Sequence, residues 1–348
     1  MRNYKDHLLD KRSSIKDGLI KLNKLGKDAI LFVVDESENL IGSLTDGDVR
    51  RGLINGIGIE DSVISIIQAS PKFLRKGDSD IKKVIEYREG NFRIIPILDK
   101  SDKVVNVINF GEIRSYLPVD AVIMAGGRGE RLKPLTDRVP KPLLKIGNKA
   151  IMEHNVDRLA LYGIDDFWFS VKYLGEQIEA HFGNGKEKNI NIRYVWENEP
   201  LGTIGAVSKI DDFEHDCVLI TNSDLLTNVD YEHFFLDFID KGADFSVVTI
   251  PYEVKVPYAV LETSNGNVVS FKEKPTYTYY SNGGVYLMKK EVLKYLPQQT
   301  HFNTTDLMEI LISKGYKIVS YPLIGYWLDV GKHEDFERAQ QDIDRIKF

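Results

Sequence analysis

The chain has 348 residues, of which 43% are hydrophobic, and its formal net charge at pH 7 is −6. This length predicts two domains, and the acidic balance argues against a nucleic-acid-binding protein, which is normally basic. No apolar run approaches the roughly 18–20 residues of a membrane span, and residues 1–16 are too polar for a signal peptide. The single cysteine, Cys217, opens an apolar run and is interpreted as a buried thiol, so we expect a cytoplasmic protein.

The first 117 residues contain a pattern that occurs twice. Ser14 precedes apolar residues at helical spacing, and Gly26 can end that helix. Two strands are expected next, over 29–34 and 40–44, and then a second helix. Adding 64 to each position aligns this segment with the next one, whose first helix is expected over 79–87. Two such β-β-α units should pack face to face, because each is too small for its own core.

This repeat resembles a tandem pair of CBS domains over residues 1–117. The spacing Gly42-x-x-Thr45-x-x-Asp48 is similar to the ribose-phosphate motif of that family. The resemblance implies a regulatory site, with Asp48 on the ribose of an adenine nucleotide and Thr45 on a phosphate. Alternatively, both side chains only cap a helix, and the pair serves assembly. The second copy has different residues at the three motif positions: Asn106, Asn109 and Glu112.

After Pro118 comes a short apolar stretch, 119–124, which reads as a buried parallel strand. Three glycines follow it, Gly126, Gly127 and Gly129, and allow backbone N–H groups to turn toward a ligand. Seven basic residues lie in or after this loop: Arg128, Arg131, Lys133, Arg138, Lys141, Lys145 and Lys149. A glycine loop with this charge at the carboxyl end of a strand predicts a polyphosphate site. A P-loop is excluded by the lack of Gly-Lys-Ser/Thr; a tight turn with a solvated basic face is the simpler alternative.

The run Gly126-Gly-x-Gly-x-Arg-Leu-x-Pro-Leu-Thr136, followed by Pro140-Lys-Pro-Leu143, resembles the signature of the sugar-1-phosphate nucleotidyltransferases. The resemblance covers about residues 119–348. It implies an α/β fold with a doubly wound, mostly parallel, Rossmann-like sheet, and the alternation of strands and helices after Pro118 independently predicts such a sheet. We therefore expect a smaller α+β CBS-pair domain over 1–117 and a catalytic domain over 118–348, each with its own core.

The loop from Trp196 to Gly205 is where the family holds the nucleobase, and its Leu-Gly-Thr-x-Gly spelling resembles the guanylyltransferases. Gly202 and Gly205 would let the backbone approach a flat ligand. Glu197 can only accept hydrogen bonds, which suits the two adjacent N–H donors of guanine better than uracil or thymine. The alternative is a solvent-exposed loop glutamate. The resemblance assigns nucleotide contacts to these residues: Ala125, Gly126, Gly127, Gly129, Glu197, Gly202 and Thr203.

Asp224 ends an apolar strand, and Asp329 lies on a turn before the last helix. The resemblance implies that both bind the catalytic Mg²⁺, as carboxylates at strand ends can. It assigns catalytic roles to Arg131, Lys141 and Lys274, and sugar-phosphate contacts to Glu273, Lys274 and Asn282.

We expect an enzyme that joins a nucleoside triphosphate, with GTP favoured, to glucosamine 1-phosphate or mannose 1-phosphate. A CBS pair ahead of this domain resembles the guanylyltransferases of nonulosonic acid synthesis, which use the former sugar. Alternatives are UTP, dTTP or CTP, a phosphocholine-type acceptor, and a catalytically silent nucleotide-sensing subunit. A glycosyltransferase of related fold would require Asp-x-Asp, whereas Ser223-Asp-Leu225 has one carboxylate. A homo-oligomer is expected.

Overall fold

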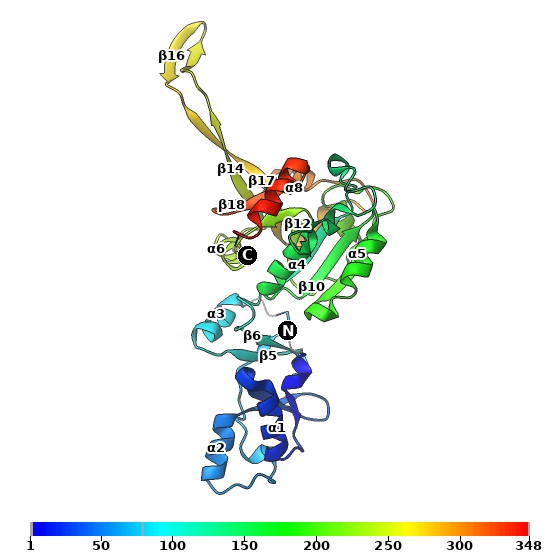
Figure 1. Cartoon of the computed structure of the whole chain (residues 1–348). Helices are drawn as coiled ribbons and strands as arrows, with labels where there is room; N and C mark the ends of the chain where they lie inside the picture. Colours follow the sequence, from blue (N-terminus) through cyan, green and yellow to red (C-terminus); the bar gives the residue numbers. More distant parts are fainter. Residues whose placement is uncertain (1–2, 78–79, 347–348) are drawn as a thin grey trace.

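The computed structural model describes residues 3–77 and 80–346. Met1, Ser79 and Phe348, which bound some of the expected segments, lie outside the described residues. Figure 1 shows a smaller amino-terminal part, a larger part built around a sheet, and a long hairpin that projects from the larger part.

The first unit of the amino-terminal part forms a three-stranded sheet in the order β1-β2-β3. Strand β1 pairs in parallel with β2, and β2 pairs antiparallel with β3. Helix α1 begins with a capping box between Ser14 and Asp17 and ends at Gly26, whose φ is 60°, as the sequence predicted. The elements are η1 (Tyr4–His7), β1 (Leu8–Asp10), α1 (Ile15–Leu25), η2 (Gly26–Asp28), β2 (Ile30–Val34), β3 (Leu40–Thr45) and α2 (Asp46–Ile54).

The second unit repeats this sheet as β4-β5-β6, with the same strand directions. The register is also repeated with the offset of 64: Ile30 pairs with Thr45, and Ile94 pairs with Asn109. The prediction of a helix after the second sheet is wrong, because none of the described residues between β6 and β7 forms a helix. The chain turns there instead: the Asn109 side chain accepts a hydrogen bond from the backbone N–H of Gly111 at 2.9 Å, and the chain continues toward β7. The elements are η3 (Val63–Ser65), β4 (Leu74–Arg75), α3 (Ile81–Glu89), β5 (Ile94–Leu98) and β6 (Val104–Asn109).

The two units pack against each other, but the second does not have a core of its own. Phe32 and Val34 of the first unit share an apolar cluster with Ile94 and Leu98 of the second. Other buried residues of the second unit, among them Ile97, belong to the cluster that fills one face of the large sheet. The expectation of a separate core on each side of Pro118 therefore holds for the first unit, which has an apolar cluster of its own around Leu31 and Val33, and is wrong for the second unit.

The large part is built on a seven-stranded, mostly parallel sheet in the order β11-β10-β7-β12-β17-β14-β18. Strands β11, β10, β7 and β12 are parallel; β17 runs antiparallel to its neighbours. Its strands are β7 (Val119–Ala125), β10 (Asp166–Val171), β11 (Asn191–Trp196), β12 (Cys217–Asn222), β14 (Phe245–Lys255), β17 (Thr276–Lys289) and β18 (Ile318–Pro322).

Both faces of this sheet are covered, as expected for a doubly wound fold. Residues alternate along β7: Ala121 and Ile123 pack in the cluster that includes α4, α5 and α6, whereas Val122 packs with η7 and α7 on the other face. The helices are α4 (Ile151–Leu161), α5 (Gly175–Phe182), α6 (Tyr231–Asp240), α7 (Thr304–Ser313) and α8 (His333–Asp342). The 3₁₀ turns are η4 (Glu130–Leu132), η5 (Lys141–Leu143), η6 (Lys186–Lys188), η7 (Gly205–Lys209) and η8 (Lys290–Tyr295).

Strands β14 and β17 continue past the sheet as a two-stranded arm (Figure 1). Its tip is the hairpin of β15 (Val260–Ser264) and β16 (Asn267–Lys272). Short strand pairs elsewhere are β8 (Lys145–Ile146) with β9 (Lys149–Ala150), and β13 (Leu225–Thr227) with β19 (Trp327–Asp329). Cys217 is a buried free thiol, as expected. Among the described helices, none combines the length and apolar character that a membrane crossing requires.

Candidate active site

A pocket lies at the carboxyl ends of β7 and β12, the edge of a parallel sheet where ligands usually bind. It encloses about 1280 Å³, part of which is open to solvent. Nine of the residues singled out from the sequence line it: Gly126, Gly127, Gly129, Arg131, Lys141, Glu197, Gly202, Thr203 and Asp224.

In the glycine loop that follows β7, Gly126 and Gly129 are needed for steric reasons, whereas a Cβ on Gly127 would meet open space. A Cβ on Gly126 would lie 2.6 Å from Glu197 Oε1, and Gly129 has a φ of 66°. The Thr136 hydroxyl donates to the carbonyl of Gly129 at 2.9 Å, and the Tyr173 hydroxyl donates to the carbonyl of Thr136 at 2.9 Å. The loop is therefore held in shape by its own continuation, as the spacing of the motif requires.

Lys141 is the buried cation of the pocket. Its ammonium group forms a hydrogen-bonded ion pair with Asp224 Oδ2, and lies 3.8 Å from Asp329 Oδ1. Asp329 does not line the pocket itself, but pairing of β13 with β19 places it opposite Leu225, next to Asp224. The structure thus brings together three residues that are separated by up to 188 positions in the sequence.

The two aspartates fit the predicted Mg²⁺ site. Asp224 Oδ1 and Asp329 Oδ1 are both buried, and neither has a hydrogen-bond partner among the described residues. Burial, and then the neighbouring charge of Asp224, raise the pKa of Asp329 above its ordinary value. Two crowded carboxylates with unpartnered oxygens are the donor set that a hard divalent cation prefers.

Arg131 is the second basic residue of the pocket, and its side chain packs over Gly331. A Cβ on Gly331 would lie 3.2 Å from the guanidinium. The other basic residues of the run do not line the pocket; Lys149, for example, pairs with Asp157 at 2.6 Å. Fewer basic residues therefore reach the pocket than the sequence implied: of the seven in the run, only Arg131 and Lys141 line it.

Glu197 is buried, so the alternative of a solvent-exposed loop glutamate is wrong. The Ser170 hydroxyl donates to its Oε1 at 2.5 Å, and the backbone N–H of Leu201 donates to its Oε2 at 3.0 Å. The Glu197 carboxylate therefore stabilises the turn that follows β11 by accepting a hydrogen bond from Leu201, and it also lines the pocket.

Gly202 and Gly205 are packed closely against the segment around residue 302. A Cβ on Gly202, whose φ is 77°, would lie 2.5 Å from the carbonyl oxygen of Phe302. A Cβ on Gly205 would lie 2.6 Å from the carbonyl oxygen of Thr300. Protein packing therefore accounts for the small size of both residues, and because Gly202 also lines the pocket, its contact with a nucleobase stays a prediction.

Several expected site residues lie outside the pocket lining. Ala125 is buried at the end of β7. Glu273 and Lys274 lie on the arm and are exposed, because β14 and β17 extend beyond the sheet. Asn282, also on β17, uses its amide to bond the hydroxyl of Tyr286 and the backbone of Gly284.

Thr45 and Asp48 lie in the amino-terminal part and form a capping box at the start of α2. Asp48 also pairs with Arg51. These contacts are those of the helix-capping alternative.

The pocket also contains residues that sequence reasoning missed. His301 and Pro200 come from loops, and Asn222 is the last residue of β12. Asn222 could have been found from its place at a strand end, two residues before Asp224. No sequence signal marks His301, which reaches the pocket because its segment packs on Gly202 and Gly205.

The family model for nucleotidyl transferases matches residues 120–345. The chain belongs to the nucleotidyl transferase family. Every pocket residue named above lies within the matched range, and the amino-terminal part lies outside it.

Similar curated proteins include several nucleotidyl transferases of known activity. The UTP–glucose-1-phosphate uridylyltransferase of Synechocystis is 29% identical over 63% of this chain and 62% of its own length. The mannose-1-phosphate guanyltransferase of Schizosaccharomyces pombe is 33% identical over 62% of each chain. The D-glycero-alpha-D-manno-heptose 1-phosphate guanylyltransferase of Aneurinibacillus thermoaerophilus is 33% identical over 65% of this chain and 98% of its own length. The chain thus spans less than two thirds of the length of the first two relatives.

Solved structures share the same fold of the larger part. A protein from Bacillus anthracis, described as a candidate glucose-1-phosphate thymidylyltransferase, matches with a TM-score of 0.53 and 23% identity, over 66% of this chain and 97% of its own. HddC from Yersinia pseudotuberculosis, in complex with GMP-PN, matches with a TM-score of 0.50 and 25% identity, over 65% of this chain and 99% of its own. The larger part is therefore a mixed α/β nucleotidyltransferase fold with a central, mostly parallel sheet.

Proposed function

We propose that this chain transfers a nucleoside monophosphate from a nucleoside triphosphate, with GTP favoured, to a sugar 1-phosphate, and releases pyrophosphate. The observation that carries the proposal is the meeting of Lys141 with Asp224 and Asp329 beside the glycine loop. Both substrates are anionic, so catalysis must come from positioning and charge neutralisation.

The loop, the two basic residues and the two aspartates then each have a chemical role. The N–H groups of the loop from Gly126 to Gly129 donate hydrogen bonds to the phosphates of the nucleotide. Arg131 holds the β- and γ-phosphates, which leave together as pyrophosphate. Lys141 draws the sugar phosphate into line with the α-phosphorus. Mg²⁺, held by Asp224 and Asp329, would supply the positive charge that offsets the developing negative charge on the phosphate oxygens.

The preference for guanine rests on Glu197 and on the relatives. The carboxylate is buried, faces the pocket and accepts hydrogen bonds only. Two similar proteins are named guanylyl- or guanyltransferases, and HddC was crystallised with a guanine nucleotide analogue. UTP is the main alternative, because the Synechocystis relative is a uridylyltransferase.

The sugar remains open between glucosamine 1-phosphate, as expected for nonulosonic acid synthesis, and mannose 1-phosphate, which the name of the Schizosaccharomyces pombe relative supports. Roles for Glu273, Lys274 and Asn282 in sugar-phosphate binding stay predictions. Neither Glu273 nor Lys274 lines the pocket in this structure.

We also propose that residues 1–117 are a tandem CBS pair and residues 118–348 the catalytic domain. The two units with identical strand order and a constant offset of 64 support this division. An adenine nucleotide at Thr45 and Asp48 stays a prediction, and their capping box favours the alternative of a role in assembly. A homo-oligomer and a cytoplasmic location are likewise predictions.

The test is a matrix of four nucleoside triphosphates against mannose, glucose, glucosamine and N-acetylglucosamine 1-phosphates, with pyrophosphate release as the readout. The proposal expects one preferred pair that contains GTP. A preferred pair with UTP would leave the reaction type intact but overturn the guanine assignment, and the lack of pyrophosphate release in every well would favour the silent, nucleotide-sensing alternative.

A further inference from the structure

A second polar cluster lies at the edge of the sheet opposite the pocket, where β10 and β12 begin. Asp165 and Asp166 come at the start of β10, and His215 stands two residues before β12. The pocket lies at the other ends of these strands, about 20 Å away for a six-residue strand. The cluster is therefore separate from the Asp224–Asp329 pair.

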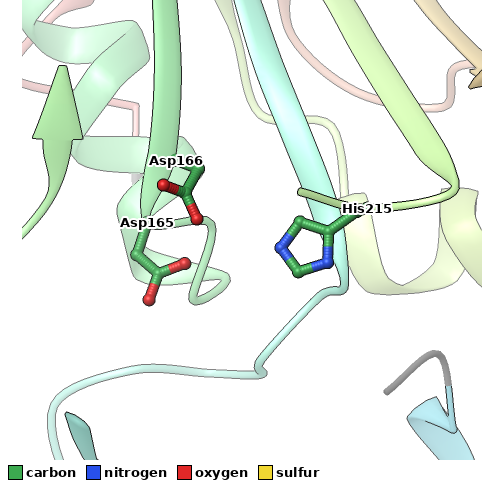
Figure 2. A group of neighbouring side chains, drawn as sticks. All are labelled: Asp165, Asp166 and His215. Carbon is green, nitrogen blue, oxygen red and sulfur yellow. The ribbon is translucent and has the colours of Figure 1, made fainter. Parts of the chain in front are cut away.

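The three side chains converge on one point. One ligand atom from each of Asp165, Asp166 and His215 lies within 4.8 Å of the other two. Figure 2 shows the imidazole ring of His215 directed toward the two carboxylates. Asp166 and His215 are buried, with relative exposures of 2% and 3%.

Neighbouring residues hold the cluster in this geometry. Asp120, fully buried on β7, accepts the backbone N–H of His215 at 2.8 Å and so fixes where that residue stands. The Asn191 amide donates to Asp166 Oδ1 at 3.0 Å. Two further donors reach Asp165 Oδ2 from the segment before β7: the Asn106 amide at 3.3 Å and the Tyr116 hydroxyl at 3.4 Å.

These bonds leave one oxygen of each carboxylate available. Asp166 Oδ2 is buried and has no hydrogen-bond partner, although the ammonium of Lys76 lies 3.3 Å away. The His215 side chain has no hydrogen bond to the described residues, and its Nδ1 is buried without a partner. A buried imidazole without a hydrogen bond, directed toward two carboxylates whose other oxygens already accept hydrogen bonds, leaves ligand atoms free to bind a metal ion.

We propose that Asp165, Asp166 and His215 bind one divalent transition-metal ion of the Zn²⁺ class. One imidazole and two carboxylates are common zinc ligands, whereas Mg²⁺ and Ca²⁺ prefer oxygen donors alone. In a tetrahedral site, ligand atoms about 2.0–2.2 Å from the ion lie about 3.3–3.6 Å from one another. The three ligand atoms of the cluster, which lie within 4.8 Å of one another, therefore have to close by up to about 1.5 Å when the ion binds. Three protein ligands leave a fourth position for water.

Lys76 is the competitor of the metal for Asp166. Its side chain is 35% exposed, so the ammonium can turn to solvent when a divalent ion takes its place. Lys76 follows β4 of the amino-terminal part, and Asn106 and Tyr116 also lie before the large sheet. A bound metal ion would therefore hold Asp165 in its hydrogen bonds with Asn106 and Tyr116, and would break the ion pair between Lys76 and Asp166.

The experiment uses the full chain, stripped with EDTA, loaded with Zn²⁺ and desalted, with bound zinc measured by mass spectrometry. The Asp224→Asn variant is run beside the wild type, so that metal at the pocket is told apart from metal at this cluster. We expect one zinc per chain in both proteins, and a loss of affinity of at least about a hundredfold in His215→Gln. His181→Gln, which alters an exposed histidine beside Glu153, is the matched control and should retain zinc.

Asp165→Asn keeps the acceptor for Asn106 and Tyr116 and is measured in parallel, in case His215→Gln does not fold. It should also lose zinc, whereas Lys76→Met should bind zinc several-fold more tightly because the competing ammonium is gone. Zinc that is absent from the wild type, or that is retained equally by folded His215→Gln or Asp165→Asn, would overturn the proposal.

Discussion

At the scale of single residues, Lys141 is set apart from the other basic residues of its run by burial and by its two carboxylate partners. Lys149 carries the same charge but pairs with Asp157 away from the pocket. We predict that Lys141→Ala lowers kcat/KM at least about a hundredfold, as the loss of a preorganised charge does. Lys149→Ala should stay within about threefold of the wild type. Equal losses in the two folded variants would mean that the loop acts through its total charge.

Glu197 gives a second test at this scale. Glu197→Gln keeps the size of the side chain and replaces one acceptor oxygen with a donor. We predict that the ratio of kcat/KM for GTP to that for UTP falls about ten- to a hundredfold, the value of one bidentate base contact. Because Ser170 donates to the same carboxylate, Ser170→Ala is the control for disturbance of the loop. An unchanged ratio in Glu197→Gln would show that Glu197 does not recognise the base and only accepts the hydrogen bonds from Ser170 and Leu201.

Asp165 predicts a dependence of folding stability on pH. Burial, and then the charge of Asp166, raise the pKa of Asp165 to about 7, while Lys76, Asn106 and Tyr116 lower it. The native state therefore binds a proton that the unfolded chain has lost, and the free energy of unfolding falls as pH rises from about 4 to about 7.

The slope contributed by this one group is at most about 1.4 kcal/mol per pH unit. Urea unfolding in EDTA at several pH values measures it, and Asp165→Asn should show a smaller decrease over that range. A wild type and variant with the same pH profile would show that Asp165 ionises normally in the native state.

At the scale of elements, local signals predicted most of the architecture. Ser14 caps a helix through contacts within four residues, and the apolar run 119–124 ends at glycines, so both signals are local. The corresponding helix α1 and strand β7 are present. The repeat was visible because an offset of 64 preserves strand positions, including the irregular pairing at Val33 and Ile97.

Contacts between distant segments could not be predicted in the same way. The arm is an example, because its projection from the sheet depends on how far β14 and β17 pair. The proximity of Asp224 and Asp329 is a second example, because only the family resemblance, and no local pattern in the sequence, predicted it. The pairing of β13 with β19 supplies the physical reason.

The loop that carries Gly202 provides a prediction at this scale. Gly202→Ala combines a positive φ with a contact of 2.5 Å to the Phe302 carbonyl, whereas Gly242→Ala has a positive φ and open space around it. We predict that Gly242→Ala costs about 1 kcal/mol, which is the strain alone, and that Gly202→Ala costs clearly more and lowers activity. Thermal unfolding and pyrophosphate release measure the two effects. Equal stabilities would show that the 302 segment moves aside freely.

At the scale of the whole molecule, the two parts are joined more closely than their separate motifs implied. Buried residues of the second unit belong to the cluster of the large sheet. Arg88 forms two hydrogen bonds to Glu232 of α6, at 2.8 and 2.9 Å. A chain that begins at Pro118 would therefore expose apolar surface that the full chain buries.

We predict that this truncated chain has a lower melting temperature than the full chain, or is insoluble, although all pocket residues are retained. The full chain with Arg88→Met is the control for loss of the ion pair alone, and should change the melting temperature less than truncation does. A truncated chain as stable and as active as the full chain would mean that the shared cluster contributes little to folding.

The central claim is that the pocket at the ends of β7 and β12 transfers a nucleotidyl group. The most direct measurement follows the label of α-³²P-GTP and of γ-³²P-GTP with the preferred sugar 1-phosphate. We predict that the α label enters the nucleotide sugar and the γ label enters pyrophosphate, and that Asp224→Asn lowers both at least about a hundredfold. Transfer of the γ label to the sugar, release of the α label as free nucleotide alone, or full activity in Asp224→Asn would contradict the account.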